Sequence, residues 1–298
     1  MNKLALASWL VGFASATARP FILGWDDSSA RSSYALGMNF DRSPGNLEIS
    51  DFDAHLLAFG DVDLTDNLTF QPAFDCSTTI LRFNDVPTSI LIDKNNLQSF
   101  GVYPSTVEAS ALLCWTSPDS PWMFGAWTRF GLASDFRDIS GDDVIFEFAG
   151  GFAYQFSEDL SLGLGAALID LSGNSEFQPG IGVDWQVSNT VRIAVCGTNA
   201  EFSYKPDENW KFSVIGISTG QLWNISDGDG KSRDIDLQSY RVGLQITRRI
   251  WGGISLGIGA GVTFDNEISL EQTNGDEILQ QRLDSGVYGM ISLNLASW

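Results

Sequence analysis

Residues 254–264 read ISLGIGAGVTF, and apolar residues alternate with small ones throughout this stretch. The period of two residues is that of a β-strand, whose successive side chains point to opposite faces. One face is wholly apolar, from Ile254 to Phe264, while the other holds only Gly, Ser and Thr. A water-covered face carries more charge and a packed core face carries bulkier side chains, so the small-residue face needs another explanation.

The same alternation recurs along the chain in segments of about ten residues, and no helical period of any length follows the N-terminus. Further examples are residues 144–156, 161–168, 181–187, 191–196 and 240–247. Short turns and long polar stretches alternate as connections between these segments. The short turns are 65–67, 118–121, 157–159, 188–190, 207–209 and 251–252. The long stretches are 41–51, 84–100, 137–143, 172–178, 226–234 and 266–284.

This pattern predicts an all-β fold, a transmembrane up-and-down antiparallel β-barrel with short periplasmic turns and longer extracellular loops. A closed sheet suits lipid because it satisfies every backbone hydrogen bond and leaves no free edge. The apolar face then meets lipid, and the Gly, Ser and Thr face lines the lumen. The brief connection at 197–200 decides the strand count: read as a hairpin it gives fourteen strands, and otherwise about twelve.

Composition narrows the function classes. The chain has 298 residues with a formal net charge of -20, which excludes binding to the nucleic-acid backbone. Cys76, Cys114 and Cys196 lie far apart with no CxxC pair, so neither a disulfide framework nor a zinc site is expected. Alternation places Cys76 outward and Cys114 inward, which argues against a disulfide between them. We expect no cofactor and no bound metal.

The N-terminus, MNKLALASWLVGFASATA, has one Lys, an apolar run and small residues before Ala18. It predicts a bacterial-type secretory signal peptide, residues 1–18, cleaved after Ala18. The apolar run is too short to span a bilayer as a helix. Residues 19–298 are then expected to form a single outer-membrane β-barrel domain.

Aromatic residues gather beside the short turns, where they predict an interface girdle at one membrane surface. Its expected members are Trp115, Trp122, Phe156, Trp185, Trp210 and Trp251. A second girdle beside the long loops would consist of Phe40, Phe83, Phe136, Trp223 and Phe264. A secreted β-sandwich or propeller would also alternate, but its exposed face would be rich in charged residues.

The second half of the chain resembles an uncharacterised family of bacterial outer-membrane barrels, domain-of-unknown-function family 6268. The matching stretches are SLGLGAALIDLSGNSEFQPGIGVDWQVSNTVRI, AEFSYKPDENWKFSVIG, QSYRVGLQITRRIWGGISLGIGAGV and LDSGVYGMISLNL, within residues 143–295. The resemblance implies a barrel and brings no substrate or catalytic residues. Trp298 departs from the terminal aromatic residue common in such barrels, because it is out of phase with Val287 and Leu293. Either the last strand ends at Leu295 or a bulge restores the phase.

Charged residues at inward positions are the candidate constriction of a pore. They are Glu108, Arg129, Glu147, Asp184, Arg192 and Arg241. One interpretation is a network of ion pairs and hydrogen bonds that fills a narrow barrel. The other is a charged constriction that selects solutes in a water-filled pore. Both interpretations place the same side chains inside the barrel.

Other inward residues suggest no chemistry. His55 is the single histidine, so a Ser-His-Asp site is not expected, and we predict that the protein is not an enzyme. Inward glycines are expected to admit large side chains from across the lumen or to permit tight curvature; they include Gly163, Gly165, Gly257, Gly259 and Gly261. A dinucleotide cradle needs a strand-to-helix turn, which GLGAAL and GIGAGV lack. The SDGDGKSRDID stretch, residues 226–236, lacks the ligand spacing of an EF-hand and predicts a solvated loop.

The sequence therefore predicts a monomeric, porin-like barrel of the bacterial outer membrane that acts as a passive pore or solute-uptake channel. The alternative from another class is a closed-lumen structural or adhesive barrel whose long acidic loops bind partners. A secreted soluble β-protein is the third possibility. Expected partners are outer-membrane lipid, the barrel-assembly machinery during biogenesis and small solutes, with no nucleic acid.

Overall fold

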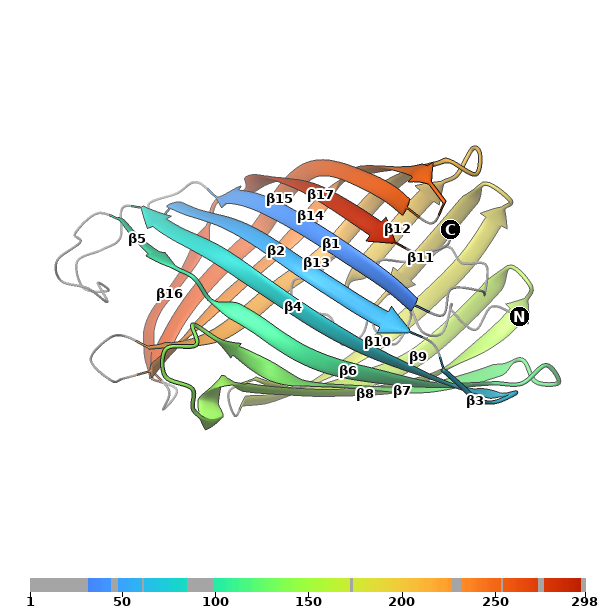
Figure 1. Ribbon diagram of the computed structural model, residues 1–298, viewed down its shortest axis with the longest axis horizontal. Coiled ribbons are helices and arrows are strands. Elements are labelled where there is room, and N and C mark those ends of the chain that lie inside the picture. The colour runs from blue at the N-terminus through green and yellow to red at the C-terminus, as the bar shows by residue number, and fades with distance from the viewer. Residues whose placement is uncertain are drawn as a thin grey trace.

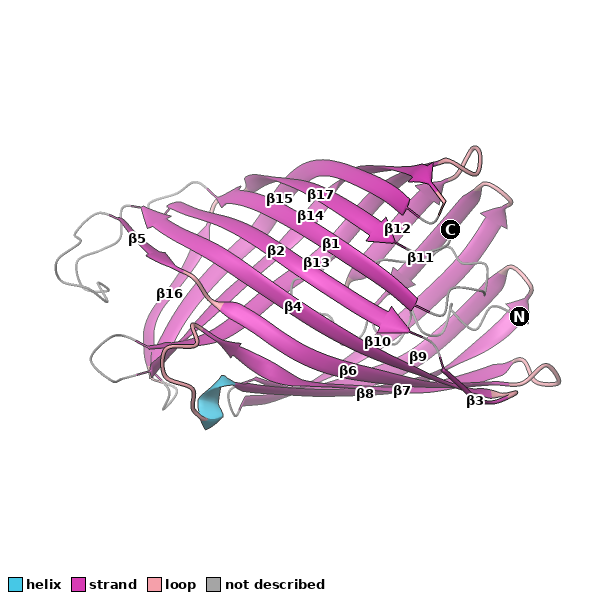
Figure 2. Ribbon diagram, viewed as in Figure 1, coloured by secondary structure: helices cyan, strands magenta, loops and turns pink. Residues whose placement is uncertain are grey.

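A computed structural model describes residues 32–43, 48–60, 62–84, 99–171, 174–226, 232–252, 254–272 and 276–295. The predicted signal peptide and Trp298 lie outside these residues. Strands make up nearly all of the described chain (Figure 2). No helix among the described residues is long and apolar enough to cross a membrane. The strands are β1 (Ser32–Ser43), β2 (Glu48–Gly60), β3 (Val62–Thr65), β4 (Leu68–Asn84), β5 (Ser99–Val102), β6 (Ser105–Thr116), β7 (Trp122–Ser134), β8 (Val144–Ser157), β9 (Leu160–Leu171), β10 (Asn174–Ser188), β11 (Val191–Cys196), β12 (Asn199–Tyr204), β13 (Trp210–Ser226), β14 (Ser232–Trp251), β15 (Ile254–Gln272), β16 (Glu277–Leu283) and β17 (Gly286–Leu295).

Antiparallel pairing closes the sheet into a barrel (Figure 1). The circuit runs β1–β2–β4–β6–β7–β8–β9–β10–β11–β12–β13–β14–β15–β17 and returns to β1, where Tyr34 lies opposite Leu295. The described circuit thus has fourteen strands, because β11 and β12 form a hairpin around Gly197, whose φ is 55°. The three remaining strands add short pairings to this circuit. β3 pairs with β4 beside β2, β5 pairs with β4 beside β6, and β16 pairs with β15 beside β17. Both the predicted fold class and the higher strand count are confirmed.

The outer face of the barrel is apolar and exposed. Leu164 of β9, Leu244 of β14 and Ile258 of β15 are 52%, 64% and 56% exposed, while the neighbouring inward residues are buried or half-buried. The same holds for the aromatic outward positions of β7 and β8, such as Phe130 and Phe148. A protein surrounded by water does not expose an apolar surface that encircles it. The molecule is a transmembrane β-barrel, and this excludes the soluble sandwich or propeller.

The small-residue face of β15 makes room for the side chains of β17. Gly261 lies opposite Tyr288 and Gly259 lies opposite Met290. A Cβ atom on Gly261 would lie 2.7 Å from Tyr288 Cε1, and one on Gly259 would lie 2.8 Å from Met290 Cγ, both too close for real atoms. The Tyr288 ring also passes over Gly243 of β14. The prediction that inward glycines admit large side chains is confirmed here, but those side chains come from an adjacent strand.

Several stretches predicted as long loops are largely strand. β13 continues to Ser226 and β14 begins at Ser232, while β15 and β16 cover most of residues 266–284. These strands reach 17, 20 and 19 residues in β13, β14 and β15, whereas about ten residues cross a bilayer. Beyond the lipid a strand needs no apolar face, so its alternation stops while its hydrogen-bond ladder continues. The alternation in the sequence therefore marks where each strand leaves the membrane and does not mark where the strand ends.

Candidate channel lumen

Aromatic side chains gather on the outside of the barrel at the short-turn end. All six residues of the predicted first girdle lie in or within a few residues of those turns: Trp115, Trp122, Phe156, Trp185, Trp210 and Trp251. Their rings pack with neighbours, since Trp122 meets the Tyr154 ring edge-on at 4.9 Å and Tyr154 meets Phe156 at 4.8 Å. The Arg248 guanidinium lies 4.9 Å from the centre of the Trp210 ring. Their location fits an interface with lipid headgroups.

The predicted second girdle is wrong in one member. Phe264 is exposed and stacks on Tyr240 at 5.8 Å, and Phe136 is exposed beside the loops. Trp223, in contrast, is only 1% exposed and points into the barrel. The prediction rested on the position of Trp223 beside the long loops, whereas its alternation with Lys211 and Ser213 places it on the lumen face of β13. The side chains of Phe40 and Phe83 lie outside the described part of the structure.

Three of the predicted constriction residues form one buried group. Arg129 of β7 lies opposite Glu147 of β8, and their side chains form an ion pair through Arg129 Nη2 and Glu147 Oε1. Arg129 Nη1 lies 3.2 Å from Oε2 of Glu108 on β6, the strand on the other side of β7. Arg129 is 3% exposed and Glu147 is 0% exposed. We refer to Glu108, Arg129 and Glu147 as the central charge group.

Backbone register and neighbouring side chains build this group. Asp75 of β4 lies directly opposite Glu108, and its carboxylate also acts electrostatically on Arg129. The Trp127 ring lies 5.9 Å from the Arg129 guanidinium carbon on the same inward face. Gly131 faces Glu108 across the ladder, where a Cβ atom would lie 2.6 Å from the Glu108 Cβ. The glycine thus leaves the space that Glu108 occupies.

Asp184 and Arg192 belong to a second group near the short turns. Arg192 of β11 holds Asp184 of β10 with two hydrogen bonds, Nε to Oδ1 at 2.7 Å and Nη2 to Oδ2 at 2.9 Å. Lys211 Nζ of β13 lies 2.7 Å from Glu201 Oε1 of β12, which also accepts a hydrogen bond from Ser213 Oγ at 2.6 Å. Charges of alternating sign therefore stand on four successive strands. We refer to Asp184, Arg192, Glu201 and Lys211 as the turn-end charge group.

The two charge groups lie at different levels of the barrel. Asp184 lies opposite Ser161 of β9, and Ser161 lies opposite Gln155 of β8. Gln155 is eight residues from Glu147 along β8. At about 3.3 Å per residue, this is roughly 26 Å along the strand. The guanidinium of Arg241 on β14 lies 5.8 Å from the centre of the Tyr288 ring. The structure thus brings five of the six candidate residues into two charge groups.

At the loop end the barrel narrows. Asn224 of β13 forms a parallel bridge with Ser134 of β7, which closes a shorter circuit of nine strands, β13–β14–β15–β17–β1–β2–β4–β6–β7. β8 to β12 lie outside this circuit at that level. The bridge is the only parallel pairing among the described strands. The space inside the nine-strand circuit is correspondingly smaller than that inside fourteen strands.

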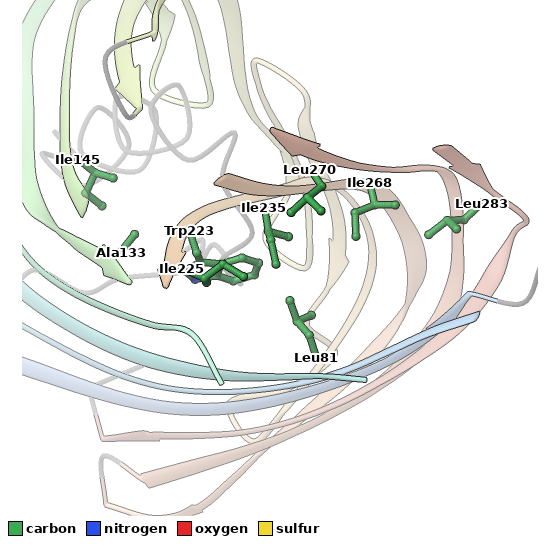
Figure 3. Close-up of a cluster of buried hydrophobic side chains, with 9 residues drawn as sticks. All are labelled: Leu81, Ala133, Ile145, Trp223, Ile225, Ile235, Ile268, Leu270 and Leu283. Atoms are coloured by element: carbon green, nitrogen blue, oxygen red, sulfur yellow. The ribbon is translucent and has the colours of Figure 1, made fainter. Parts of the chain in front are cut away.

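Apolar side chains fill this narrow end. Figure 3 shows them pointing toward one another from opposite walls, Leu81 from β4 and Trp223, Ile225 and Ile235 from β13 and β14. All are nearly inaccessible to solvent. We name this set the loop-end apolar cluster; its members are Leu81, Ala133, Ile145, Trp223, Ile225, Ile235, Ile268, Leu270 and Leu283. Sequence reasoning placed several of these residues in loops and so missed the cluster.

The sequence-based prediction also omitted four other lumen residues, although the alternation of their strands places them inward. Asp75, Trp127, Glu201 and Lys211 all stand at inward positions of alternating strands. Asp75 could have been found from the parity of LTFQPAFDCSTTI, and Glu201 from AEFSY. His55 lies in β2 opposite Ser77, and its side chain is outside the description. Cys76, Cys114 and Cys196 take part in no disulfide in the described part of the chain.

Comparison with known proteins gives distant likenesses in structure and one family match. No curated protein matches the sequence. An outer membrane channel from Pseudomonas putida F1 is 10% identical, covering 92% of this chain and 100% of that chain with a TM-score of 0.46. The toluene transporter TodX from Pseudomonas putida is 10% identical, covering 98% and 97% with a TM-score of 0.39. The translocator domain of the autotransporter NalP from Neisseria meningitidis is 9% identical, covering 91% and 89% with a TM-score of 0.36.

Likenesses this distant transfer no solute and no mechanism to the chain. The family match is of another kind, because a family model fits residues 119–295, more than half of the 298 residues. This interval includes the strand and turn patterns of residues 143–295 on which the resemblance was recognised. The chain belongs to the family described as domain of unknown function DUF6268.

Proposed function

We propose that this protein is an outer-membrane channel for small polar solutes, closed at its loop end in the state described. The export signal predicted for residues 1–18 and the transmembrane barrel together support the outer membrane as its location. Lipid and the barrel-assembly machinery are its expected partners. We propose transport and no catalysis, since the charged lumen groups described are engaged in ion pairs.

The observation that carries this proposal is the change in lining along the barrel. Charged residues line it at two levels, while the apolar cluster fills the interior of the narrow loop end. Buried ion pairs are a poor way to stabilise a protein, because apolar replacements of similar volume are often as good or better. A barrel that served structure alone would gain little from the central and turn-end charge groups. A channel uses such groups to choose among solutes, and an apolar constriction to block them.

The test is conductance of the mature chain in planar bilayers, after a heat-dependent gel shift has established folding. Trp223→Ala removes the largest side chain of the apolar cluster and is expected to raise the open probability above that of the parent. Glu147→Gln in the Trp223→Ala background is expected to shift ion selectivity toward anions, since it removes a lumen carboxylate. A folded Trp223→Ala protein that never conducts would count against the channel.

The closed-lumen structural barrel remains the second candidate function. The observation that favours it is the burial of the central charge group, where Glu147 is fully inaccessible. It predicts that both substitutions lower the free energy of unfolding and that neither produces current. If Trp223→Ala conducts and the double variant has the same ion selectivity, the protein is a pore whose selectivity does not depend on the central charge group.

A further inference from the structure

The last ten residues of β13, 217–226, are supported differently from the rest of the barrel wall. Along its first half, β13 pairs with β12 on one side and β14 on the other, but the pairing with β12 ends at Gly216. It ends there because the β11–β12 hairpin turns back between Cys196 and Asn199. We refer to residues 217–226 as the outer arm of β13.

Contacts on the free side of the outer arm are few among the described residues. The Ser218 amide donates to Asn199 Oδ1 at 3.2 Å, just above the hairpin. At the far end, Asn224 makes the parallel bridge to Ser134 of β7, and the Ser226 amide donates to Asp135 Oδ2 at 3.3 Å. On its other side the arm pairs with β14 along its whole length, up to Ser226 opposite Ser232. The junction with β7 is therefore the narrowest joint in the nine-strand circuit.

The side chains on the two faces of the outer arm favour opposite positions of the arm, one closed against β7 and one away from it. On the lumen face, Trp223 and Ile225 are buried in the loop-end apolar cluster, which favours the closed position. On the other face, Asn224 Nδ2 donates to Asp234 Oδ1 of β14 at 2.7 Å. That carboxylate is repelled by Asp142 and Asp143 of η1 (Gly141–Asp143) and by Glu271 of β15. Apolar burial thus stabilises the joint between β13 and β7, and carboxylate repulsion opposes it.

We propose that the outer arm of β13, moving together with the outer ends of β14 and β15 that continue its ladder, is the gate of the channel. The gate is closed when Asn224 bridges Ser134. It opens when this bridge and the Ser226–Asp135 hydrogen bond break, which withdraws Trp223 and Ile225 from the lumen. The hinge lies just beyond Gly216, where support from β12 ends. This inference rests on the proposed channel function and adds the moving part to it.

A reversible disulfide tests the gate directly. In a background of Cys76→Ser, Cys114→Ser and Cys196→Ser, the pair Ser134→Cys and Asn224→Cys joins the two residues that form the bridge. Bridge partners lie close enough for a disulfide. Oxidation is expected to lower the open probability by about tenfold or more, because the open arrangement becomes inaccessible, and reduction is expected to restore it. The pair Asp135→Cys and Ser226→Cys provides a second lock if the first variant does not fold.

A matched control places a disulfide inside the moving unit. Thr219 and Ser239 face each other in the β13–β14 ladder, and their hydroxyl oxygens are 2.6 Å apart. Thr219→Cys with Ser239→Cys in the same background should conduct equally when oxidised and reduced. Equal conductance of the β7–β13 locked protein in both states would overturn the gate and leave the channel intact. Absence of current from the reduced proteins and from Trp223→Ala alike would overturn the channel, and the gate with it.

Discussion

Arg129 of β7 and Glu147 of β8 face each other in the barrel ladder and form a buried ion pair, with Glu108 on the opposite side of the guanidinium. One cation thus stands between two carboxylates, with a third, Asp75, acting on it from β4. Since all of these strands are neighbours, these contacts follow from local sheet register. Its energetic weight can be measured by single substitutions.

Arg129→Ala is expected to lower the free energy of unfolding by about 3–5 kcal/mol, because it leaves buried carboxylates without their cation. Urea titration followed by the heat-dependent gel shift measures this change. Arg282→Ala is the control, since the Arg282 side chain is 81% exposed and should change stability by less than about 0.5 kcal/mol. If both variants lost stability equally, the central charge group would contribute no more to the free energy of unfolding than an exposed charge does.

Gly261→Ala is expected to destabilise the barrel by about 1–3 kcal/mol through overpacking. A Cβ atom there would meet the backbone of Val242 and Gly243 as well as the Tyr288 ring, so no side-chain movement relieves it. Gly150→Ala is the matched control on another strand, where the nearest atom to a new Cβ is 3.8 Å away. Urea midpoints of the two variants compare them, and an unchanged midpoint for Gly261→Ala would contradict the packing described.

Opposite shifts in ion selectivity are expected from two substitutions in the turn-end charge group. Asp184→Asn removes a carboxylate that is 19% exposed, and Lys211→Gln removes an ammonium that is 12% exposed. In a Trp223→Ala background, the first should move the reversal potential toward anion selectivity and the second toward cation selectivity. Shifts of the same sign, or none, would mean that permeating ions do not pass this group.

Acidic pH is expected to favour the closed gate through Asp234, which lies beyond the lipid-facing part of β14 that begins at Tyr240. Burial raises the pKa of the Asp234 carboxyl above its ordinary value; the hydrogen bond from Asn224 opposes this rise, and the carboxylates of η1 and β15 add to it. The folded protein therefore binds this proton more tightly than the unfolded chain. The free energy of unfolding falls as pH rises from the ordinary pKa to the raised pKa.

In the parent protein, the open probability should therefore decrease as the pH is lowered from neutral to acidic. Asp234→Asn should lose most of this dependence and stay closed more of the time at neutral pH, because the repelled charge is gone. Asp119→Asn, in an exposed short turn at the other end of the barrel, is the control and should keep the parent's pH profile. An Asp234→Asn profile identical to that of the parent would show that another group governs the response.

The local pattern predicted much of the fold. Ile258 and Gly259 were assigned to opposite faces from alternation alone, and the structure places them so, because a strand's period of two fixes side-chain direction residue by residue. The same parity predicted that Glu108, Arg129 and Glu147 face inward. It could not show that they touch, because contact depends on which residue of the next strand lies opposite.

Trp223 shows what local pattern leaves open. Its parity with Lys211 and Ser213 places it on the lumen face of β13, but parity does not tell whether that face lines a wide lumen or a packed constriction. The bridge between Asn224 and Ser134, 90 residues apart in the numbering, bends β13 toward β7 and decides the environment of Trp223.

By itself, the sequence determined the barrel, the lipid-facing surface and the set of inward residues, because these follow from the two-residue period and from the need of a backbone in lipid to pair with itself. Only the tertiary structure decided which inward charges share a group, where the barrel narrows and which side chains close it. These features depend on strand register and on contacts between strands distant in the chain, and neither is written in the periodicity of any one strand.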